Sequence, residues 1–335
     1  MAEKRAVGVT LPGASSPAQA AALGARAEAA GCDAVWVLDV RRDPYLLSAA
    51  VAGSTSRVAI GTNVAVAFAR SPTVTAAAAW DLALWTGGRF VLGLGSQVGP
   101  TLKARFGVIA DRPAARMRDY VTAVRACFQS FRKGYGGYEG EFYSIRRPAF
   151  QPGAEALDHD PPIYVAAVNP LMAQVVGEVG DGLAAHTFIT EDYMREVLLP
   201  ALQSGAARAD KSRPPVLLQM LVAPSREAAS AQMLAYVVPG YRRVLDHAGL
   251  GEIADRVMEA MREGRRAEAR QLIDQHLLDR LAIVFGADPE SLGAALERWS
   301  PHAERLSLSV PWFGTDQTEQ AAHFERVLQG LAKLH

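Results

Sequence analysis

The sequence predicts an α/β protein of the (β/α)8 (TIM) barrel class, with insertions after the fourth and seventh strands. Short β-branched runs alternate with alanine-rich helical segments along the chain, as parallel α/β folds require. Eight strand candidates occur, which is the number that closes this barrel. The 335 residues are enough for a barrel of roughly 250 residues plus insertions. No Pro/Gly/Ser-rich linker divides them, so we expect one domain over residues 1–335.

The first part of the chain shows the alternation most clearly. Each of its three helix candidates begins at a proline, which suits a first helical turn, and two of them end at a glycine, which suits a helix end. A fourth strand follows the third helix. In chain order, the expected strands and helices are Val7–Leu11, Pro17–Gly31, Ala34–Val40, Pro44–Gly53, Arg57–Ala69, Pro72–Trp85 and Arg89–Ser96.

The pattern lapses after the fourth strand and again after the seventh. After the fourth strand we expect an irregular loop over 97–112 and an amphipathic helix over Pro113–Phe131. A Gly/Tyr-rich stretch over 133–150 should then form a short hairpin or an excursion over the surface. After the seventh we expect a long helical stretch over about Ser225–Arg280. The remaining strand candidates are Pro162–Val168, Gly182–Phe188, Pro215–Ala223 and Arg305–Phe313.

Composition limits the partners and the compartment. Lys+Arg and Asp+Glu both number 35, so the net charge is zero and no basic excess favours nucleic acid. No apolar run of 18 residues favours a membrane span, and the charged start of the chain does not resemble a signal peptide. We therefore expect a cytoplasmic protein. Cys32 and Cys127 fall in helix-like apolar segments and are expected to be free core thiols.

No constellation of side chains identifies a metal site or an activated nucleophile. H-E-x-x-H and G-x-S-x-G are absent, and the histidines have no ligand spacing. The dinucleotide fingerprint G-x-G-x-x-G is missing between the first strand and the first helix, and the glycines at 93–99 follow the fourth strand instead. We therefore expect no metal, and we expect a bound organic cofactor to supply the chemistry.

Two titratable residues stand at predicted strand ends, where such barrels place their active sites. Asp39 ends an apolar strand, so it is a candidate acid, base or cofactor-orienting group; a helix cap or an ion pair with Arg41 or Arg42 is the alternative. His186 is the one histidine at a predicted strand end. It is either a ligand-binding or proton-transfer group or a hydrogen-bonded structural histidine.

A candidate phosphate-binding turn follows the fifth strand. Val168 and Asn169 precede Pro170, which fits the first turn of a helix. The unpaired N–H groups and the dipole at a helix start attract anions. An ordinary strand-to-helix turn is the alternative.

Several segments stand in an order that a known family shares. These are the third strand, the R-x-P entry at Arg70, GGRF at 87–90, GLGSQ at 93–97, PPIYVAAVNP at 161–170 and LSVPWF at 308–313. Together they resemble the luciferase-like monooxygenase superfamily, and in particular its branch that uses the deazaflavin coenzyme F420. The match covers nearly the whole chain.

The resemblance implies where the central ring of the cofactor binds. It places a β-bulge with a non-prolyl cis peptide bond in the third strand, at Thr62–Asn63 by matching positions. The backbone around Asn63, Val64 and Ala65 would then face the ring.

The resemblance also implies contacts with the rest of the cofactor and with the substrate. Ser96 and Gln97 match positions near the ribityl chain, and Val168 and Asn169 match the phosphate-binding turn, where the family often has glycine. Trp312 is either a wall of the substrate pocket or a buried strand-end aromatic residue.

The activity that the resemblance implies is hydride transfer between F420 and a small organic substrate, with Asp39 or His186 moving the accompanying proton. Sugar-phosphate dehydrogenases of the family have a histidine after this acid, whereas Val40 stands here, which argues against that activity. The alternatives are an FMN-dependent two-component monooxygenase and a non-catalytic flavin-binding relative.

The partners expected are therefore a small-molecule substrate and, by resemblance, a second copy of the chain in a homodimer. Arg41 and Arg42 could attract an anionic cofactor tail or could simply be solvated, and Lys103 and Arg105 carry the same ambiguity.

Overall fold

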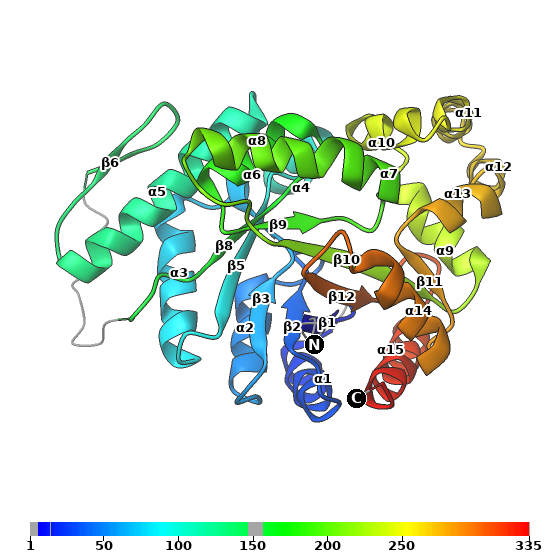
Figure 1. The fold of residues 1–335 in the computed structure, drawn as a ribbon, viewed down its shortest axis with the longest axis horizontal. Coiled ribbons are helices and arrows are strands. Elements are labelled where there is room, and N and C mark those ends of the chain that lie inside the picture. The colour runs from blue at the N-terminus through cyan, green and yellow to red at the C-terminus, as the bar shows by residue number, and fades with distance from the viewer. Residues whose placement is uncertain (1–5, 14, 147–156, 335) are drawn as a thin grey trace.

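Eight parallel strands form a closed ring in the computed structural model, which describes residues 6–13, 15–146 and 157–334 (Figure 1). The ring closes because β10 pairs with β9 on one edge and with β12 on the other. The predicted (β/α)8 barrel is therefore confirmed. The ring strands are β1 (Ala6–Thr10), β2 (Ala34–Val37), β3 (Ala59–Thr62), β5 (Phe90–Gly95), β8 (Ile163–Ala166), β9 (Gly182–Ala185), β10 (Val216–Ala223) and β12 (Arg305–Ser309).

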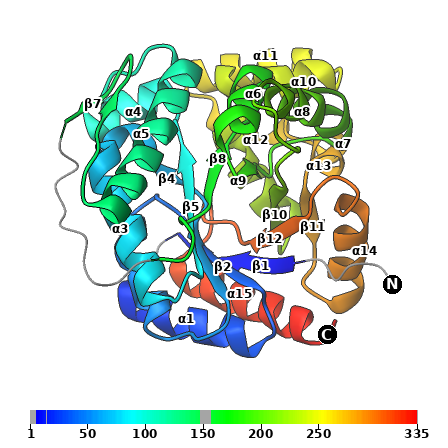
Figure 2. The same ribbon diagram turned by 60° about the vertical axis from the view of Figure 1, so that its left-hand side comes forward.

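Helices surround the ring on its outer side (Figures 1 and 2). Seven of them have proline in the first turn, and Ser16, Asp43, Ser71 and Asp288 cap four of these by accepting backbone N–H groups. The predicted helix starts are thereby confirmed. The covering helices are α1 (Pro17–Ala29), α2 (Pro44–Ala52), α3 (Pro72–Trp85), α5 (Pro113–Lys133), α6 (Pro170–Val179), α8 (Leu199–Arg208), α14 (Pro289–Trp299) and α15 (Gln317–Ala332).

Large side chains from facing strands fill the inside of the ring. Trp36 of β2 and Tyr164 of β8 are buried, with ring centroids 6.4 Å apart. Gly61 of β3 admits the indole, since a Cβ there would lie 2.4 Å from the ring of Trp36. The barrel is thus packed rather than hollow at this level, which leaves its rim for ligands.

The insertion after β5 carries the expected hairpin. It contains α4 (Gly99–Phe106) within the segment predicted as loop, then α5, and then β6 (Tyr138–Glu139) paired with β7 (Ser144–Ile145). Asp119 of α5 holds the hairpin by accepting the N–H groups of Phe142 and Tyr143 at 2.7 and 3.0 Å. Part of the predicted hairpin segment, residues 147–150, lies outside the described residues.

The insertion after β10 is helical, as expected, and packs around a separate apolar cluster. It contains α9 (Arg226–Met233), short 3-10 turns at 234–236 and 239–241, α10 (Arg242–His247), α11 (Gly251–Arg262), α12 (Arg266–Gln271) and α13 (Gln275–Arg280).

A short strand that the sequence analysis did not predict, β11 (Ile283–Phe285), follows this insertion. It pairs with the last three residues of β10, beyond the point where β9 and β10 pair with each other. The N–H of Ala282 donates to the carbonyl of Thr187 at 3.2 Å, so the segment also contacts the continuation of β9. At the rim, β11 therefore lies between the ends of β9 and β10.

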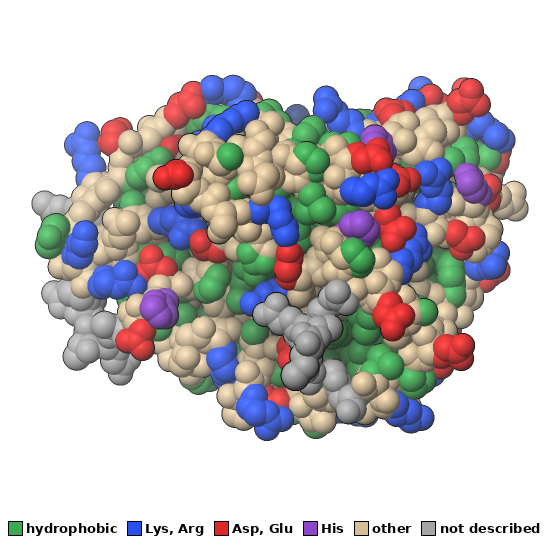
Figure 3. All heavy atoms as spheres, in the orientation of Figure 1, with side chains coloured by type: hydrophobic (Ala, Val, Ile, Leu, Met, Phe, Trp, Pro, Cys, Tyr) green, Lys and Arg blue, Asp and Glu red, His purple; other side chains and the backbone are tan. Residues whose placement is uncertain are grey.

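The charged surface and the two cysteines agree with what the sequence predicts. Acidic and basic side chains are interspersed over the face in Figure 3. Cys32 and Cys127 are free and buried, as predicted, and burial raises the pKa of Cys32 to about 12. Within the described ranges, no helix combines the length and apolar character needed to cross a bilayer.

Candidate active site

The residues singled out from the sequence follow the carboxyl ends of different strands. Asp39 follows β2, Asn63 follows β3, His186 follows β9 and Trp312 follows β12. Because all ring strands run parallel, these positions share one rim of the barrel. The topology thus brings them to the face where barrels of this class bind ligands.

A β-bulge interrupts the third strand at this rim. Gly61 pairs with Val91 and Ala65 with Leu94, so the segment has one more residue than β5 between these pairs. The hydroxyl of Thr62 bridges the gap: it accepts the N–H of Gly93 at 2.9 Å and donates to the carbonyl of Gly93 at 2.6 Å. The predicted bulge is present.

The cis peptide bond lies at Asn63–Val64, so its predicted position at Thr62–Asn63 is wrong by one residue. The pairing with β2 explains the difference. Thr62 still pairs with Val37, and the N–H of Asn63 donates to the carbonyl of Val37 at 2.8 Å. The regular hydrogen bonding between β2 and β3 therefore extends one residue further than the family resemblance indicated.

Two glycines of β5 make room for the bulge. A Cβ on Gly93 would lie 1.8 Å from the carbonyl oxygen of Thr62, and one on Gly95 would lie 2.5 Å from a methyl group of Val64. The spaced glycines of GLGS therefore serve strand packing.

Asn63 presents an unsatisfied donor at the bulge. Its side chain is 7% exposed, and its Nδ2 has no hydrogen-bond partner within the described part of the chain. A buried donor without an acceptor costs about 1–3 kcal/mol. An acceptor oxygen of a ligand at the rim would remove that cost.

Asp39 is held in place by three different donors. One carboxylate oxygen accepts the N–H of Val66 and Nη1 of Arg70, both at 3.1 Å. Arg105 of α4 lies 3.6 Å from the other oxygen and also donates to the backbone carbonyl of Asp39 at 3.2 Å. This arrangement favours a fixed anchor for the bulge over a group that exchanges protons.

Arg70 links the ends of two strands to the start of α2. Its second Nη donates to Asp43 at 2.7 Å, and its guanidinium lies 5.2 Å from the ring centroid of Tyr45. Burial opposes the charge, but the bonds to Asp43 and Asp39 raise the pKa of Arg70. Arg41 and Arg42 are exposed, so neither of them supplies the ion pair considered for Asp39. Sequence reasoning missed the Arg70 partnership, although R-x-P marked the position.

His186 has one ring nitrogen occupied and one available. Its Nδ1 accepts the N–H of Phe188 at 3.0 Å, so the ring proton resides on Nε2, which has no partner among the residues described. The ring contacts those of Tyr236 and Tyr241, with centroids 4.3 and 5.2 Å away. Burial lowers the pKa of His186 to about 3. At neutral pH this histidine is therefore a neutral hydrogen-bond donor rather than an acid.

A buried side-chain amide connects the insertion that carries Tyr236 and Tyr241 to the loop after β12. Gln232 of α9 accepts the N–H groups of Trp312 and Phe313 at 3.0 and 3.1 Å, and it donates to the hydroxyl of Tyr236 at 3.1 Å. The indole Nε1 of Trp312 is buried without a partner in the described residues. Sequence reasoning missed Gln232 and both tyrosines, because a helical insertion gives no signal of which side chains reach the rim.

The residues expected near the cofactor tail lie on the loops that follow β5 and β8. Ser96 is partly exposed, and the exposed Gln97 has φ 58° and accepts the N–H of Val98 at 2.9 Å with its own side chain. The carbonyl of Val168 accepts the hydroxyl of Tyr193 at 3.0 Å.

Asn169 precedes α6 without capping it. Its Nδ2 donates instead to the carbonyl of Gly240 at 3.2 Å, in the insertion after β10. The first-turn N–H groups of α6 therefore have no side-chain cap, which leaves them available to an anion.

Comparisons with known proteins found relatives of this chain. A family model described as luciferase-like monooxygenase matches residues 4–300. An uncharacterized protein of Mycobacterium tuberculosis is 35% identical over 286 residues, which are 81% of this chain and 84% of that protein. Another protein of that organism, provisionally named a coenzyme F420-dependent oxidoreductase, is 30% identical over 305 residues, with 82% and 86% covered.

A solved structure shares the whole fold. The coenzyme F420-dependent tetrahydromethanopterin reductase from Methanopyrus kandleri matches with a TM-score of 0.80 and 21% identity, and 98% of each chain is covered. At that identity the likeness concerns the fold.

Proposed function

The chain belongs to the luciferase-like monooxygenase family, and on that premise we propose that it is a coenzyme F420-dependent oxidoreductase that transfers hydride between the deazaflavin and a small organic substrate. It is an oxidoreductase, as its named relatives are. The choice of F420 is supported by the relative that carries this coenzyme in its name and covers 82% of the chain.

The unsatisfied amide of Asn63 is the observation that carries the proposal. A ring carbonyl of a deazaflavin would accept from its Nδ2, and the backbone at Val64 and Ala65 would lie along the ring. When bound, the deazaflavin supplies or accepts the hydride.

The cofactor tail would follow the strand ends around the rim. Ser96 and Gln97 would contact the ribityl chain, and Val168, Asn169 and the uncapped first turn of α6 would hold the phosphate.

The chain's own residues position the reaction. Asp39 and Arg70 hold the bulge against which the ring would lie. His186 holds a proton at Nε2 and donates a hydrogen bond from it to a substrate oxygen. Trp312, on the loop fixed by Gln232, would form a wall of the substrate pocket.

A titration of the purified protein with F420 and with FMN tests this function. We expect F420 to bind with micromolar affinity and FMN to bind far more weakly. Asn63→Asp keeps the shape of the side chain but removes both donors, so it should weaken F420 binding about tenfold. Binding of FMN alone would replace the proposal with a flavin-dependent monooxygenase. Bound F420 that no carbonyl or alcohol panel oxidises or reduces would indicate a non-catalytic relative.

We also propose that the chain forms a homodimer. Leu46 of α2 and Val74 and Trp85 of α3 are 66%, 58% and 61% exposed, and an interface over α2 and α3 would cover them. Light scattering should then give about twice the chain mass of 35.8 kDa. A mass of one chain at micromolar concentration would refute the dimer.

A further inference from the structure

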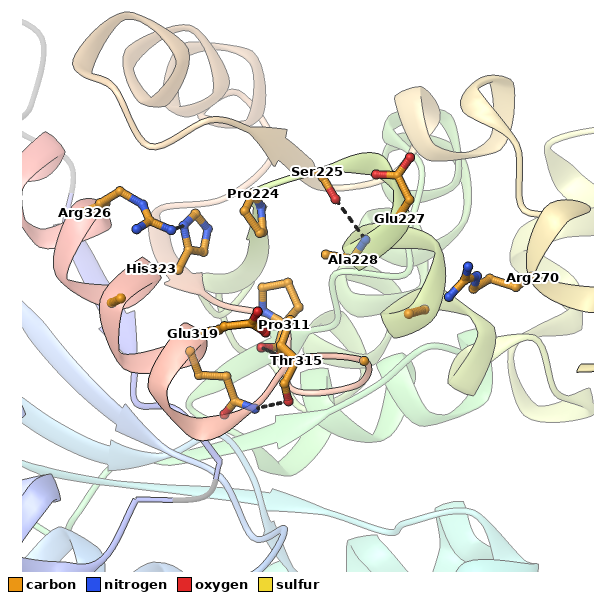
Figure 4. Close-up of a pocket in the computed structure, with 14 residues that line it drawn as sticks. Pro224, Ser225, Glu227, Ala228, Arg270, Pro311, Thr315, Glu319, His323 and Arg326 are labelled. Carbon is orange, nitrogen blue, oxygen red and sulfur yellow. Dashed lines mark hydrogen bonds between the residues drawn. The ribbon is translucent and has the colours of Figure 1, made fainter. Parts of the chain in front are cut away.

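A cavity of about 400 Å³ lies between α9 and α15, away from the residues assigned to the cofactor. Figure 4 shows Arg326 and His323 on one side of it and Arg270 on the other, with Ser225, Pro311 and Thr315 between them. The loop after β12 separates this cavity from the rim, since Pro311, Gly314 and Thr315 line it.

The two arginines at this cavity lack a carboxylate partner. Arg270 makes no side-chain hydrogen bond or ion pair with the described residues, and Arg326 donates only to Nδ1 of His323 at 3.3 Å. Burial lowers the pKa of His323, so it is neutral at physiological pH. Its Nε2 donates to the carbonyl of Val222 at 2.9 Å, which leaves Nδ1 as the acceptor for Arg326. Both guanidinium groups therefore keep donors free for an anion.

The two acidic side chains at the cavity already have donors of their own. Glu319 accepts the N–H of Asp316 at 3.2 Å as half of the capping box of α15. Glu227 lies in the first turn of α9, where its own N–H and the hydroxyl of Ser225 lower its pKa, with a smaller contribution from the charge of Arg270. Neither carboxylate forms an ion pair with the arginines.

A buried acceptor at the cavity has no donor. Gln320 is 4% exposed, and its Nε2 donates to the carbonyls of Thr315 and Trp312 at 3.2 and 3.4 Å. These two carbonyls fix which end of the amide is nitrogen. Its Oε1 has no partner in the part of the chain that is described. A hydroxyl group of a ligand in the cavity would supply one after a small side-chain adjustment.

We propose that the α9–α15 cavity binds a small hydroxylated anion. A carboxylate or phosphate would accept hydrogen bonds from Arg270 or Arg326, and a neighbouring hydroxyl would donate to Oε1 of Gln320. The volume lies at the small end of the range for ligand pockets. This site is independent of the proposed F420 chemistry.

Isothermal titration calorimetry of the full chain at low ionic strength tests the site, with malate, succinate and glycerol 3-phosphate as probes. Succinate lacks only the hydroxyl of malate. We expect malate or glycerol 3-phosphate to bind with a Kd below about 1 mM, and succinate to bind at least about fivefold more weakly than malate. Binding of malate alone identifies a carboxylate ligand, and binding of glycerol 3-phosphate alone identifies a phosphate ligand.

Matched variants locate the bound anion. Arg270→Gln and Arg326→Gln together should weaken binding at least about tenfold, since charge-assisted hydrogen bonds are lost. Arg262→Gln on α11, which does not line the cavity, should bind as the wild type does, and all variants should retain the wild-type affinity for F420. The proposal is overturned if neither hydroxylated probe binds at about 10 mM or if the double variant binds unchanged. Equal affinity for malate and succinate would refute the hydroxyl contact.

Discussion

The two sides of the barrel rim are built in different ways. On the side of β2, β3 and β5, the site consists of strand ends tied together by Thr62, Asp39 and Arg70. On the side of β9, β10 and β12, it consists of His186 and of side chains that an insertion brings in, held by the amide of Gln232. The first side is part of the barrel itself, whereas the second can change with the insertion while the barrel stays intact. We infer that the first side serves the cofactor and the second side selects the substrate.

The largest effect is expected at the β5 glycine facing the bulge. Gly93→Ala would place a Cβ 1.8 Å from the carbonyl of Thr62. It should lower the free energy of unfolding by about 3 kcal/mol, measured by urea denaturation. Gly99→Ala is the control, because no atom lies within 4 Å of its Cβ position. Equal stability of the two variants would show that the bulge is not confined by β5.

A smaller loss is expected when the anchor of the bulge loses its charge. Asp39→Asn leaves Arg70 and Arg105 with weaker acceptors, so unfolding should become easier by about 2 kcal/mol. Asp111→Asn removes an ion pair with Arg116 whose carboxylate is largely exposed, so its effect on the free energy of unfolding should be much smaller. If Asp39→Asn changes neither stability nor F420 binding, the anchoring role is wrong.

On the insertion side, His186 should make stability depend on pH. Its folded pKa of about 3 lies below its ordinary value of 6.5, so the unfolded chain binds a proton that the folded chain excludes. The neutral His186 therefore contributes fully to the free energy of unfolding above pH 6.5. That contribution is lost as the pH falls from 6.5 towards 3, with a slope of up to about 1.4 kcal/mol per pH unit. Urea denaturation between pH 7 and 4.5 should show a shallower loss in His186→Gln than in the wild type. If the free energy of unfolding depends on pH equally in both proteins, the imidazole is exposed to solvent and the interpretation is wrong.

The smallest effect is expected at the amide that joins the inserted segment to the loop after β12. Gln232→Met strands the N–H groups of Trp312 and Phe313 and should cost about 1–2 kcal/mol. Gln232→Glu retains an acceptor for both N–H groups, so the free energy of unfolding should fall less. Its tryptophan fluorescence emission should match that of the wild type. Indistinguishable emission and stability in both variants would mean that the loop holds itself in place.

The strand side could be predicted further from the sequence than the insertion side. Prolines and capping residues mark the helix starts, and β-branched runs mark the ring strands, because these signals are local. The family order of segments located the bulge near Asn63. The predicted position of the cis bond was wrong by one residue. Thr62 still pairs with Val37 of β2, and no local sequence pattern shows how far that pairing extends.

What the sequence did not disclose depends on contacts between distant residues. Asp39 contacts Arg70 and Arg105 across 31 and 66 positions, whereas Arg41 and Arg42 lie nearer to it in the sequence. Tyr236 and Gln232 lie in a stretch whose pattern predicts only helix. The strand β11 has three residues, too few to show a period.

The placement of β11 gives the barrel a tapered shape. Near the base β9 and β10 adjoin, while towards the top a further strand separates them. One additional strand enlarges the circumference there by about 4.8 Å, so the opening is wider than the packed floor beneath it. Because the inserted helices connect to that same strand, lengthening or trimming them would alter the width of the opening and leave the floor unchanged. Related chains could thus admit substrates of different size without rebuilding the part that holds Trp36 and Tyr164.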